Sequence, residues 1–403
     1  MVPTTMLRMV VGHSDDVDLG GALATVFAQC DAGLHGATPR AGLLMSTWEV
    51  DHQALIDAVR AGYPGIELVG TSSAGEMSSV LGFREDSIAL VLFASDSIDI
   101  TAGLGRDLTT DAAAAARQAV AEAAARTRLP HRLCIVLSSV GAVDAALVLD
   151  GLREALGPGV PIIGGGSPAR DPMSGSDFLS GRQFAGDVLA SNSLAILLFA
   201  GPLAFSFGVE TGWHGVGPRA IVTRASSVAV FEIDGRPARE FYERYIGAGQ
   251  PPLANPLAVY DGAGSERFYL RTPIAFDAQT GSVAFAGSVP EGASVQITMA
   301  ATDQIFEGAR ASISEALAAF PAGVQPEGAL LFSCATRKYL LGTRAGHEFD
   351  LARDVLGNNV PIGGFYCLGE IAPMASPDLT RFHNATMVSV LLGSARPGRA
   401  PVA

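Results

Sequence analysis

The chain has 403 residues, of which 48% are hydrophobic and 17% charged, and its formal net charge at pH 7 is -13. A single hydrophobic core rarely serves this length, so two domains are expected, and the apolar content excludes a disordered chain. Lys338 is the single lysine. Nucleic acids and anionic membrane surfaces are therefore excluded as direct partners, because they are bound through clustered Lys and Arg.

No apolar stretch approaches the roughly 20 residues that a membrane-spanning helix needs. Residues 1–18 also lack the basic, apolar and small-residue succession of a signal peptide. The cysteines at 30, 134, 334 and 367 have neither the spacing of a zinc site nor the density of a disulfide scaffold. These features predict a cytoplasmic protein without membrane insertion.

One succession of elements occurs three times along the chain: an apolar strand, a helix, a short strand, a glycine with an acid six residues later, and another apolar strand. The units comprise 41–45, 50–61, 67–69 and 87–93; then 133–137, 142–156, PIIGGGSPARD and 193–199; then 329–334, 346–356, VPIGGFYCLGE and 386–392. The glycine and acid pairs are Gly70 and Glu76, Gly165 and Asp171, and Gly364 and Glu370. Glycine permits close approach of a ligand, so each unit offers an open turn with a carboxylate beyond it. A purely structural turn is the alternative.

A different region lies between the second and third units. Residues 220–229 and 268–297 alternate like antiparallel strands, whereas the Ala-rich segment 111–128 predicts a helix. We therefore expect an α/β fold of two domains, 1–219 and 220–394, with mixed sheets built from repeated strand-helix-strand units. The tail 395–403 is expected to be mobile.

Four motifs in this order resemble those of the FIST family: GTSSAGEM at 70–77, FEIDGRPAREFY at 231–242, PIGGFYCLGEIAP at 361–373 and FHNATM at 382–387. The resemblance implies paired N-terminal and C-terminal FIST domains of a bacterial signal-transduction sensor for small ligands, with amino acids proposed. In a subset of similar proteins it implies haem binding and nitric oxide sensing, with output to a histidine kinase or a cyclic-dinucleotide enzyme. No kinase or cyclase segment follows residue 393, so the signal is expected to pass to a partner protein in trans.

The main candidate ligand site lies in the third unit. Its glycines allow close approach, its aromatic pair offers a surface, and its acid can accept an ammonium group, which suits an amino acid. These residues are Gly363, Gly364, Phe365, Tyr366, Gly369 and Glu370. The alternative is a turn that holds the domain together, with the aromatic pair in the core.

Further candidates flank this segment. Arg337 follows a buried strand, where it could pair a carboxylate, and Cys334 is either a small buried residue or a reactive thiolate. His383 and Asn384 are candidates to line the pocket, with a structural role as the alternative. Ser72 and Glu76 suggest an equivalent pocket in the first unit, whereas Asp171 lies in a more divergent turn.

No cofactor is predicted, and haem is the alternative, with His214 or His383 as its ligand in an apolar slot. A cysteine-dependent enzyme that uses Cys334 and His383 is a second alternative. The chain contains no GxSxG, Walker A or HExxH motif and no GxGxxG that opens a helix. A sensory binding protein without catalytic activity is therefore expected.

Overall fold

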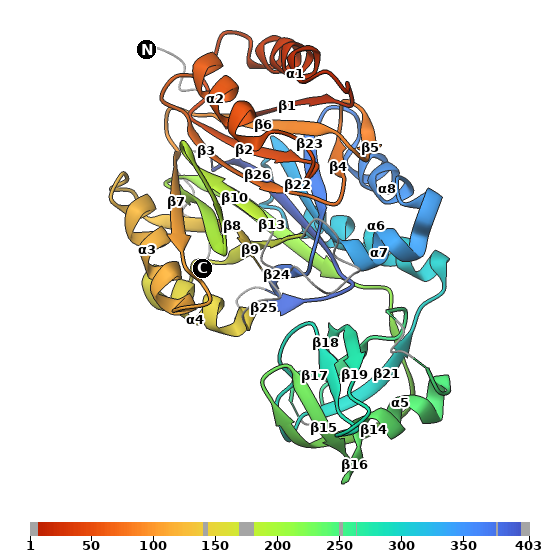
Figure 1. Ribbon diagram of the computed structural model, residues 1–403. Helices are drawn as coiled ribbons and strands as arrows, with labels where there is room; N and C mark the ends of the chain where they lie inside the picture. The colour runs from red at the N-terminus through yellow and green to blue at the C-terminus, as the bar shows by residue number, and fades with distance from the viewer. Residues whose placement is uncertain are drawn as a thin grey trace.

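The computed structural model describes residues 7–139, 144–168, 181–249, 253–262, 264–375 and 378–395. Three six-stranded mixed sheets form a large body with helices on its outside, and a smaller antiparallel lobe lies at one end (Figure 1). The predicted α/β class is confirmed. Among the described residues, no helix is long and apolar enough to span a bilayer. Asp171 and the tail beyond Ala395 lie outside these residues.

The first sheet has the strand order β1-β6-β2-β3-β10-β11. A parallel pair lies at its centre, and β6 and β1 extend it on one side in antiparallel pairing. These elements are β1 (Arg8–Ser14), β2 (Ala41–Ser46), β3 (Glu67–Ser72) and β6 (Ile88–Ala94), with α1 (Leu19–Leu34) and α2 (His52–Gly62). The two helices cover the outer face of this sheet, where they pack against strand residues such as Leu44 and Leu68. The side chains of Asp18 and Asp51 cap the two helices, which fixes where each begins.

The second and third sheets have the same arrangement, a parallel pair beside two antiparallel strands. The second holds β7 (Asp99–Arg106), β8 (His131–Ser139), β9 (Ile162–Ser167) and β12 (Ser193–Ala200), covered by α3 (Ala112–Ala124) and α4 (Ala145–Leu156). The third holds β13 (Leu203–Glu210), β22 (Gly328–Cys334), β23 (Ile362–Cys367) and β26 (Met387–Ser394), covered by α6 (Thr302–Ala319), α7 (Ala335–Leu341) and α8 (His347–Leu356). A short 3-10 helix, η1 (Gly342–Arg344), joins α7 to α8.

Each sheet is completed by a hairpin that comes from a neighbouring one. The hairpins are β4 (Glu76–Ser78) with β5 (Gly82–Arg84), β10 (Arg182–Ala185) with β11 (Val188–Ser191), and β24 (Glu370–Pro373) with β25 (Thr380–His383). The first follows β3 but pairs with β23, the second follows β9 but pairs with β3, and the third follows β23 but pairs with β9. The three sheets therefore exchange strands in a closed cycle.

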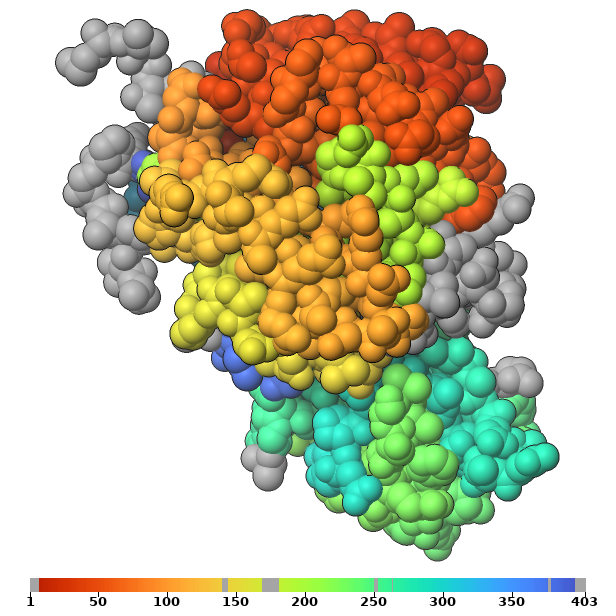
Figure 2. Space-filling model, turned by 60° about the vertical axis from the view of Figure 1, so that its left-hand side comes forward, coloured from red at the N-terminus to blue at the C-terminus, as the bar shows by residue number. Residues whose placement is uncertain are grey.

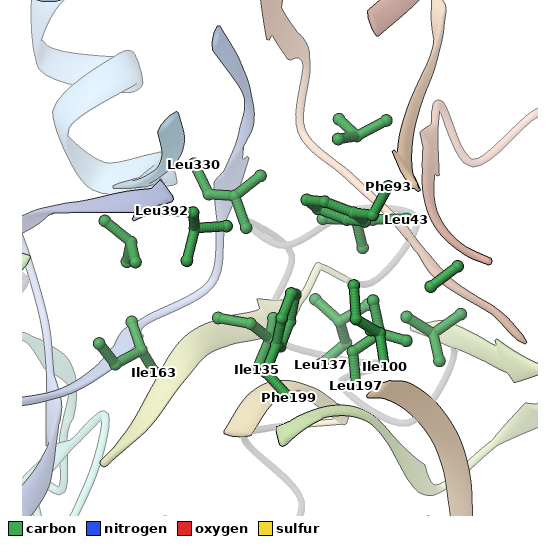
Figure 3. Packing of buried hydrophobic residues seen from close by; sticks show 14 of the residues in the cluster. Leu43, Phe93, Ile100, Ile135, Leu137, Ile163, Leu197, Phe199, Leu330 and Leu392 are labelled. Atoms are coloured by element: carbon green, nitrogen blue, oxygen red, sulfur yellow. The ribbon is translucent and has the colours of Figure 1, made fainter. Parts of the chain in front are cut away.

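One hydrophobic core fills the space between the three sheets. Side chains alternate along a strand, so each sheet turns one apolar face inward and the other toward its helices. Figure 3 shows inward side chains of all three sheets, including Leu43, Ile135 and Leu330. The rings of Phe93 and Phe199 meet edge to face, with centroids 5.5 Å apart. The core belongs to the whole body and to no single unit.

The lobe comprises residues 214–299 and has its own hydrophobic cluster. Its elements are β14 (His214–Ser226), β15 (Ala229–Ile233), β16 (Arg236–Pro237), α5 (Ala238–Ile246), β17 (Leu257–Tyr260), β18 (Phe268–Arg271), β19 (Pro273–Phe276), β20 (Val283–Phe285) and β21 (Ser294–Met299). Figure 2 shows it projecting from the body beneath the segment that carries α3 and α4. The domain boundary expected at residue 219 stays a prediction. Strand pairing connects the two sides of that boundary, because β13, which precedes it, pairs with β26, which follows it.

Replacement of Phe199 by alanine should test the shared core. The side chain is fully buried among residues of more than one sheet. We expect Phe199→Ala to lower the free energy of unfolding by about 3–5 kcal/mol, the range for deleting a buried aromatic ring. Urea unfolding followed by circular dichroism measures this change. Leu147→Ala on α4, where the side chain is 54% exposed, is the control; equal small effects of both variants would contradict the assignment.

Candidate functional site

The three turns singled out in the sequence meet in the structure and are hydrogen-bonded in a ring. The amide of Ala74 donates to the carbonyl of Tyr366 (2.9 Å), and the amide of Gly166 donates to the carbonyl of Gly369 (2.9 Å). The Ser72 hydroxyl donates to the carbonyl of Pro168 (3.2 Å), and the hydroxyls of Thr71 and Ser167 are hydrogen-bonded. The exchanged strands leave from this ring.

The strands β4, β10 and β24, which pair with a neighbouring sheet, each carry one buried polar side chain. These side chains lie opposite equivalent positions of β23, β3 and β9. Glu76 lies opposite Phe365, Gln183 opposite Thr71, and Glu370 opposite Gly165. All three are fully buried. The sequence analysis found the two glutamates but missed Gln183, because the spacing from glycine pointed to Asp171. Gln183 could have been found from a short local pattern, in which a glycine stands one or two residues before the polar residue and an apolar residue follows it. This pattern occurs as Gly75-Glu-Met around Glu76 and as Gly181-Arg-Gln-Phe around Gln183.

Glu76 belongs to a buried network of hydroxyls. Its two carboxylate oxygens accept hydrogen bonds from Ser73 and Ser87. Ser87 also lies 2.8 Å from Nε2 of His13, whose Nδ1 is 2.7 Å from Ser78. Burial raises the pKa of Glu76 to about 7, although the hydroxyls oppose this change, and burial lowers the pKa of His13 to about 4. The network therefore holds a neutral imidazole and a carboxyl that titrates near neutral pH.

Glu370 lies between two cysteines and the start of β26. The Cys367 thiol donates to Oε1 (3.4 Å), and the amide of Thr386 donates to Oε2 (3.1 Å). Burial raises the pKa of Glu370 to about 8. Burial and the neighbouring carboxyl raise the pKa of Cys334 to about 12, and that of Cys367 also rises. Both thiols are therefore protonated at neutral pH and lack the character of a nucleophile.

Arg337 binds an internal carboxylate. Its Nε donates to Oε1 of Glu348 (2.8 Å), and the Tyr366 hydroxyl donates to Oε2 of the same residue (2.6 Å). Arg337 also donates to the carbonyl of Ile305 (2.8 Å) and is fully buried. This cluster joins α7, which carries Arg337, to β23, α6 and α8. Arg337 and Tyr366 thus contact protein groups on the helix-covered face of the third sheet.

The remaining residues of the third turn are closely packed against protein. Phe365 lies in the central core, edge to face with Phe332. A Cβ atom on Gly363 would lie 2.4 Å from Val91, one on Gly364 would lie 2.3 Å from the carbonyl oxygen of Leu331, and one on Gly369 would lie 2.2 Å from the ring of Phe382. Gly369 also has φ +81°, which favours glycine. These glycines allow close approach of protein segments, and their role toward a ligand stays a prediction.

A cleft of about 270 Å³ lies between the lobe and the body. Its walls come from the end of β13, from β18 and from the segment around β24 and β25; the residues are Val209, Glu210, Thr211, Glu266, Arg267, Phe268, Tyr269, Leu270, Met374, His383 and Thr386. Thr386 connects the cleft to Glu370, because its amide holds that buried carboxyl. A larger surface hollow of about 390 Å³ near Asp31 and Tyr63 contains none of the predicted residues. Of the predicted residues that the structure describes, His383 alone lines the cleft.

A second carboxyl group lies beside that of the cleft residue Glu210. Glu210 ends β13, and its side chain is hydrogen-bonded to that of Glu315 on α6. Partial burial and the neighbouring charge of Glu210 raise the pKa of Glu315 to about 7. No ion pair joins either side chain to a basic residue within the described part of the chain. The pair therefore carries negative charge that a cationic group could neutralise.

Polar contacts hold the lobe against the body. Asn384 accepts a hydrogen bond from the amide of Thr272 in the lobe (3.0 Å). The guanidinium of Arg271, also in the lobe, donates to the carbonyl of Phe382 (2.9 Å). Arg381 of the body pairs with Asp261 of the lobe. Asn384 is thus a connecting residue beside the cleft.

The two histidines proposed as haem ligands do not fit that role. His383 is 2% exposed, and its Nε2 lies 2.9 Å from the carbonyl oxygen of Ala372. Burial lowers its pKa to about 4. His214 is exposed at the start of β14, where it pairs with Met299, which is itself 52% exposed. Neither imidazole faces a deep apolar slot of the kind that holds haem.

The fold and the cleft define a two-part α/β protein with room for a small ligand. The sequence model of the FIST N domain matches residues 40–236, and that of the FIST C domain matches residues 238–373. The chain belongs to the FIST family, as its four motifs indicated. FIST domains are sensory, ligand-binding domains of signal transduction.

Related proteins have similar length. An uncharacterized protein of Mycobacterium tuberculosis, Rv0628c, is 26% identical over 396 residues, which cover 94% of this chain and 99% of the relative. The uncharacterized protein Mb0898c of Mycobacterium bovis is 27% identical over 191 residues, covering 44% and 48% of the two chains. Among solved structures, a cyanuric acid hydrolase from A. caulinodans has a TM-score of 0.32 and 13% identity, covering 97% of this chain and 100% of that one. Another cyanuric acid hydrolase has a TM-score of 0.37 and 8% identity, with the same coverage.

Glu370 should make stability depend on pH. Because its pKa rises from 4.5 to about 8 on folding, the folded state binds more protons than the unfolded state between these values. The stability of the protein should therefore fall as pH rises through this window. We expect Glu370→Gln to reduce this loss, as measured by urea midpoints at pH 5 and pH 8. Glu307→Gln, at an exposed position of α6, is the control for net charge; the same pH dependence in all three proteins would contradict the prediction.

Proposed function

We propose that this FIST protein is a sensor that binds a small zwitterion of the amino-acid class in the cleft between lobe and body. The carboxyl pair of Glu210 and Glu315 carries this proposal, because an ammonium group beside it would neutralise like charges. Arg267 also lines the cleft; its guanidinium is partly exposed and pairs with Asp378 and Asp261, and a ligand carboxylate would share its donors. Phe268 and Leu270 supply apolar wall for a side chain. The cleft volume suits a small ligand.

A binding role is favoured over catalysis. The thiol of Cys334 is buried with a raised pKa, and His383 is neutral and bonded to a backbone carbonyl. A nucleophile activated by a base needs the two side chains within hydrogen-bond reach, and no hydrogen bond joins this pair among the described residues. We infer a protein without catalytic activity that acts in the cytoplasm.

Signalling would follow from a change in how the lobe sits on the body. A ligand shifts such an equilibrium only if it binds the two arrangements with different affinity. A zwitterion between Glu210 of the body and Arg267 of the lobe would have this property, because closure brings both groups to the ligand. The changed surface would be read by a partner in trans, such as a histidine kinase or a cyclic-dinucleotide enzyme.

The ligand class can be tested with the twenty amino acids in a thermal-shift screen, followed by calorimetry on those that stabilise the protein. We expect Glu210→Gln to weaken binding at least tenfold, because the ammonium group loses its charged partner. Binding to the unaltered protein should be tighter at pH 8 than at pH 6, since Glu315 loses its proton near pH 7. Glu315→Gln should remove this pH dependence.

Glu307→Gln is the matched control, a carboxyl lost from an exposed position of α6. Equal affinity in Glu210→Gln and in the control would show that the ligand binds elsewhere. If no amino acid stabilises the protein, the ligand class is wrong. A stoichiometric haem absorption band that shifts with nitric oxide and disappears in His214→Ala or His383→Ala would instead establish the haem alternative.

The lobe's response can be followed by small-angle scattering. Asn384→Ala removes the acceptor of the Thr272 amide, so we expect the free variant to show a larger radius of gyration than the unaltered protein. An amino acid that binds should reduce this difference. Asn192→Ala, at a loop beside β12, is the control, since its side chain contacts Thr109 of the body. Identical scattering with and without ligand in every protein would contradict lobe closure.

A further inference from the structure

A second polar cluster lies at the carboxyl ends of β2 and β3, apart from the cleft. Ser46 and Ser72 end these parallel strands in register, so their side chains share one face of the sheet. That face is the one covered by α2, since the neighbouring Leu44 and Leu68 pack there. His52 begins α2 directly above. The carboxyl end of a parallel pair is a common place for ligands in α/β sheets.

Arg182 of the exchanged strand β10 joins this cluster. Its amide donates to the Ser72 hydroxyl (3.0 Å), and its guanidinium lies 3.2 Å from Nδ1 of His52. The guanidinium also stacks on the ring of Trp48, 4.3 Å from the ring centre. No ion pair with a carboxylate is found for Arg182 within the described ranges. Arg182 and Trp48 are partly exposed, so the cluster opens to solvent at this side.

Two buried polar atoms of the cluster, Oγ of Ser46 and Nε2 of His52, have no hydrogen-bond partner in the part of the chain that the structure describes. Both residues are fully buried. The guanidinium of Arg182 can only donate to Nδ1 of His52, which places the ring proton on Nε2, and the imidazole also has a hydrogen bond to the backbone of Val50. Leaving such groups unpaired costs roughly 1–3 kcal/mol each. Around Arg182, the Ser46 hydroxyl and Nε2 of His52 are thus left without an acceptor among the described residues.

We propose that Arg182, His52 and Ser46 form a second binding site, which takes the carboxylate group of a small monoanion. Carboxylate oxygens would accept from the guanidinium, from Nε2 and from the Ser46 hydroxyl, which satisfies both unpaired groups. Trp48 holds the guanidinium plane in place by stacking. The site is formed by β2, α2 and the exchanged strand β10, so it exists only when the sheets have assembled.

The local charges favour a monoanion over phosphate. Glu49 and Asp51 lie close enough to His52 to act on its charge. Asp51 is held as the cap of α2, and Glu49 accepts a hydrogen bond from Thr47. A dianion would be repelled by both carboxylates and attracted by one guanidinium. The imidazole stays neutral, because burial and then Arg182 lower its pKa to about 4.

The test uses Trp48, one of two tryptophans in the chain. Acetate is titrated at constant ionic strength while tryptophan fluorescence is recorded, and inorganic phosphate is titrated in parallel. We expect a saturable change with acetate in the millimolar range, at least tenfold weaker in Arg182→Gln. Arg60→Gln on α2, which loses an exposed ion pair with Asp187, is the matched control and should respond like the unaltered protein. The full chain is used throughout.

Ser46→Ala supplies a second, independent measurement. Because the hydroxyl is buried and unpaired, its removal should raise the urea midpoint of the free protein and weaken acetate binding about threefold or more. A purely structural hydroxyl would give a lower midpoint. The proposal is overturned if acetate gives no saturable change, if Arg182→Gln responds like Arg60→Gln, or if phosphate binds more tightly. Glu210→Gln should keep the acetate response, which separates this site from the proposed function of the cleft.

Discussion

Strand exchange among the three sheets is the constraint on which the rest of the body depends. Without the hairpins, β3, β9 and β23 would each be an exposed edge with unpaired backbone groups. Each edge is covered by a strand that leaves a neighbouring sheet, so no sheet is complete without another. The parts matched as FIST N and FIST C share the third sheet, because β4 pairs with β23. Assembly of the body should therefore be cooperative.

The exchange also explains why carboxyl groups are buried. The chain must turn sharply from one sheet into the next, and the first inward position after that turn lies at the end of the apolar core. There the hydroxyls of Ser73 and Ser87, or the amide of Thr386, hold a carboxyl whose pKa is raised by burial. Gln183 fills the same position as a neutral side chain and bonds Ser139 (2.7 Å). A polar residue is retained there because hydroxyls of the neighbouring strands need a partner.

The sequence predicted the strands and helices of the three repeated units because their apolar periodicity is local, but it did not predict α1 or α6. The strands predicted at 41–45 and 67–69 are β2 and β3, and the helix predicted at 111–128 is α3; the parallel pairing of β2 with β3 was not predicted. The exchange was beyond prediction, since the pairing of Glu76 with Phe365 depends on residues far apart in the chain. The same limit applied to the site. Arg337 has the chemistry of a carboxylate ligand, but its partner Glu348 is internal, and the cleft residues Glu210 and Arg267 belong to no motif.

The lobe is the part of the molecule best suited to move. The body is held by an apolar core and by backbone pairing that runs through all three sheets, so shifting one sheet would break both. The lobe has its own core, so a shift of the lobe need not break a sheet of the body. Its contact with the body combines ion pairs and hydrogen bonds with apolar packing of Ala258, Tyr260 and Leu270 in the cluster under the third sheet. The ion pair of Arg381 with Asp261 is partly exposed and contributes little net stability, whereas the hydrogen bonds of Arg271 and Asn384 are buried. A ligand in the cleft touches both parts and lies one residue, Thr386, from the buried carboxyl of Glu370. Ligand binding can therefore act on the lobe directly. It can also act on the ring of three hydrogen-bonded turns, through the Thr386 amide that holds Glu370.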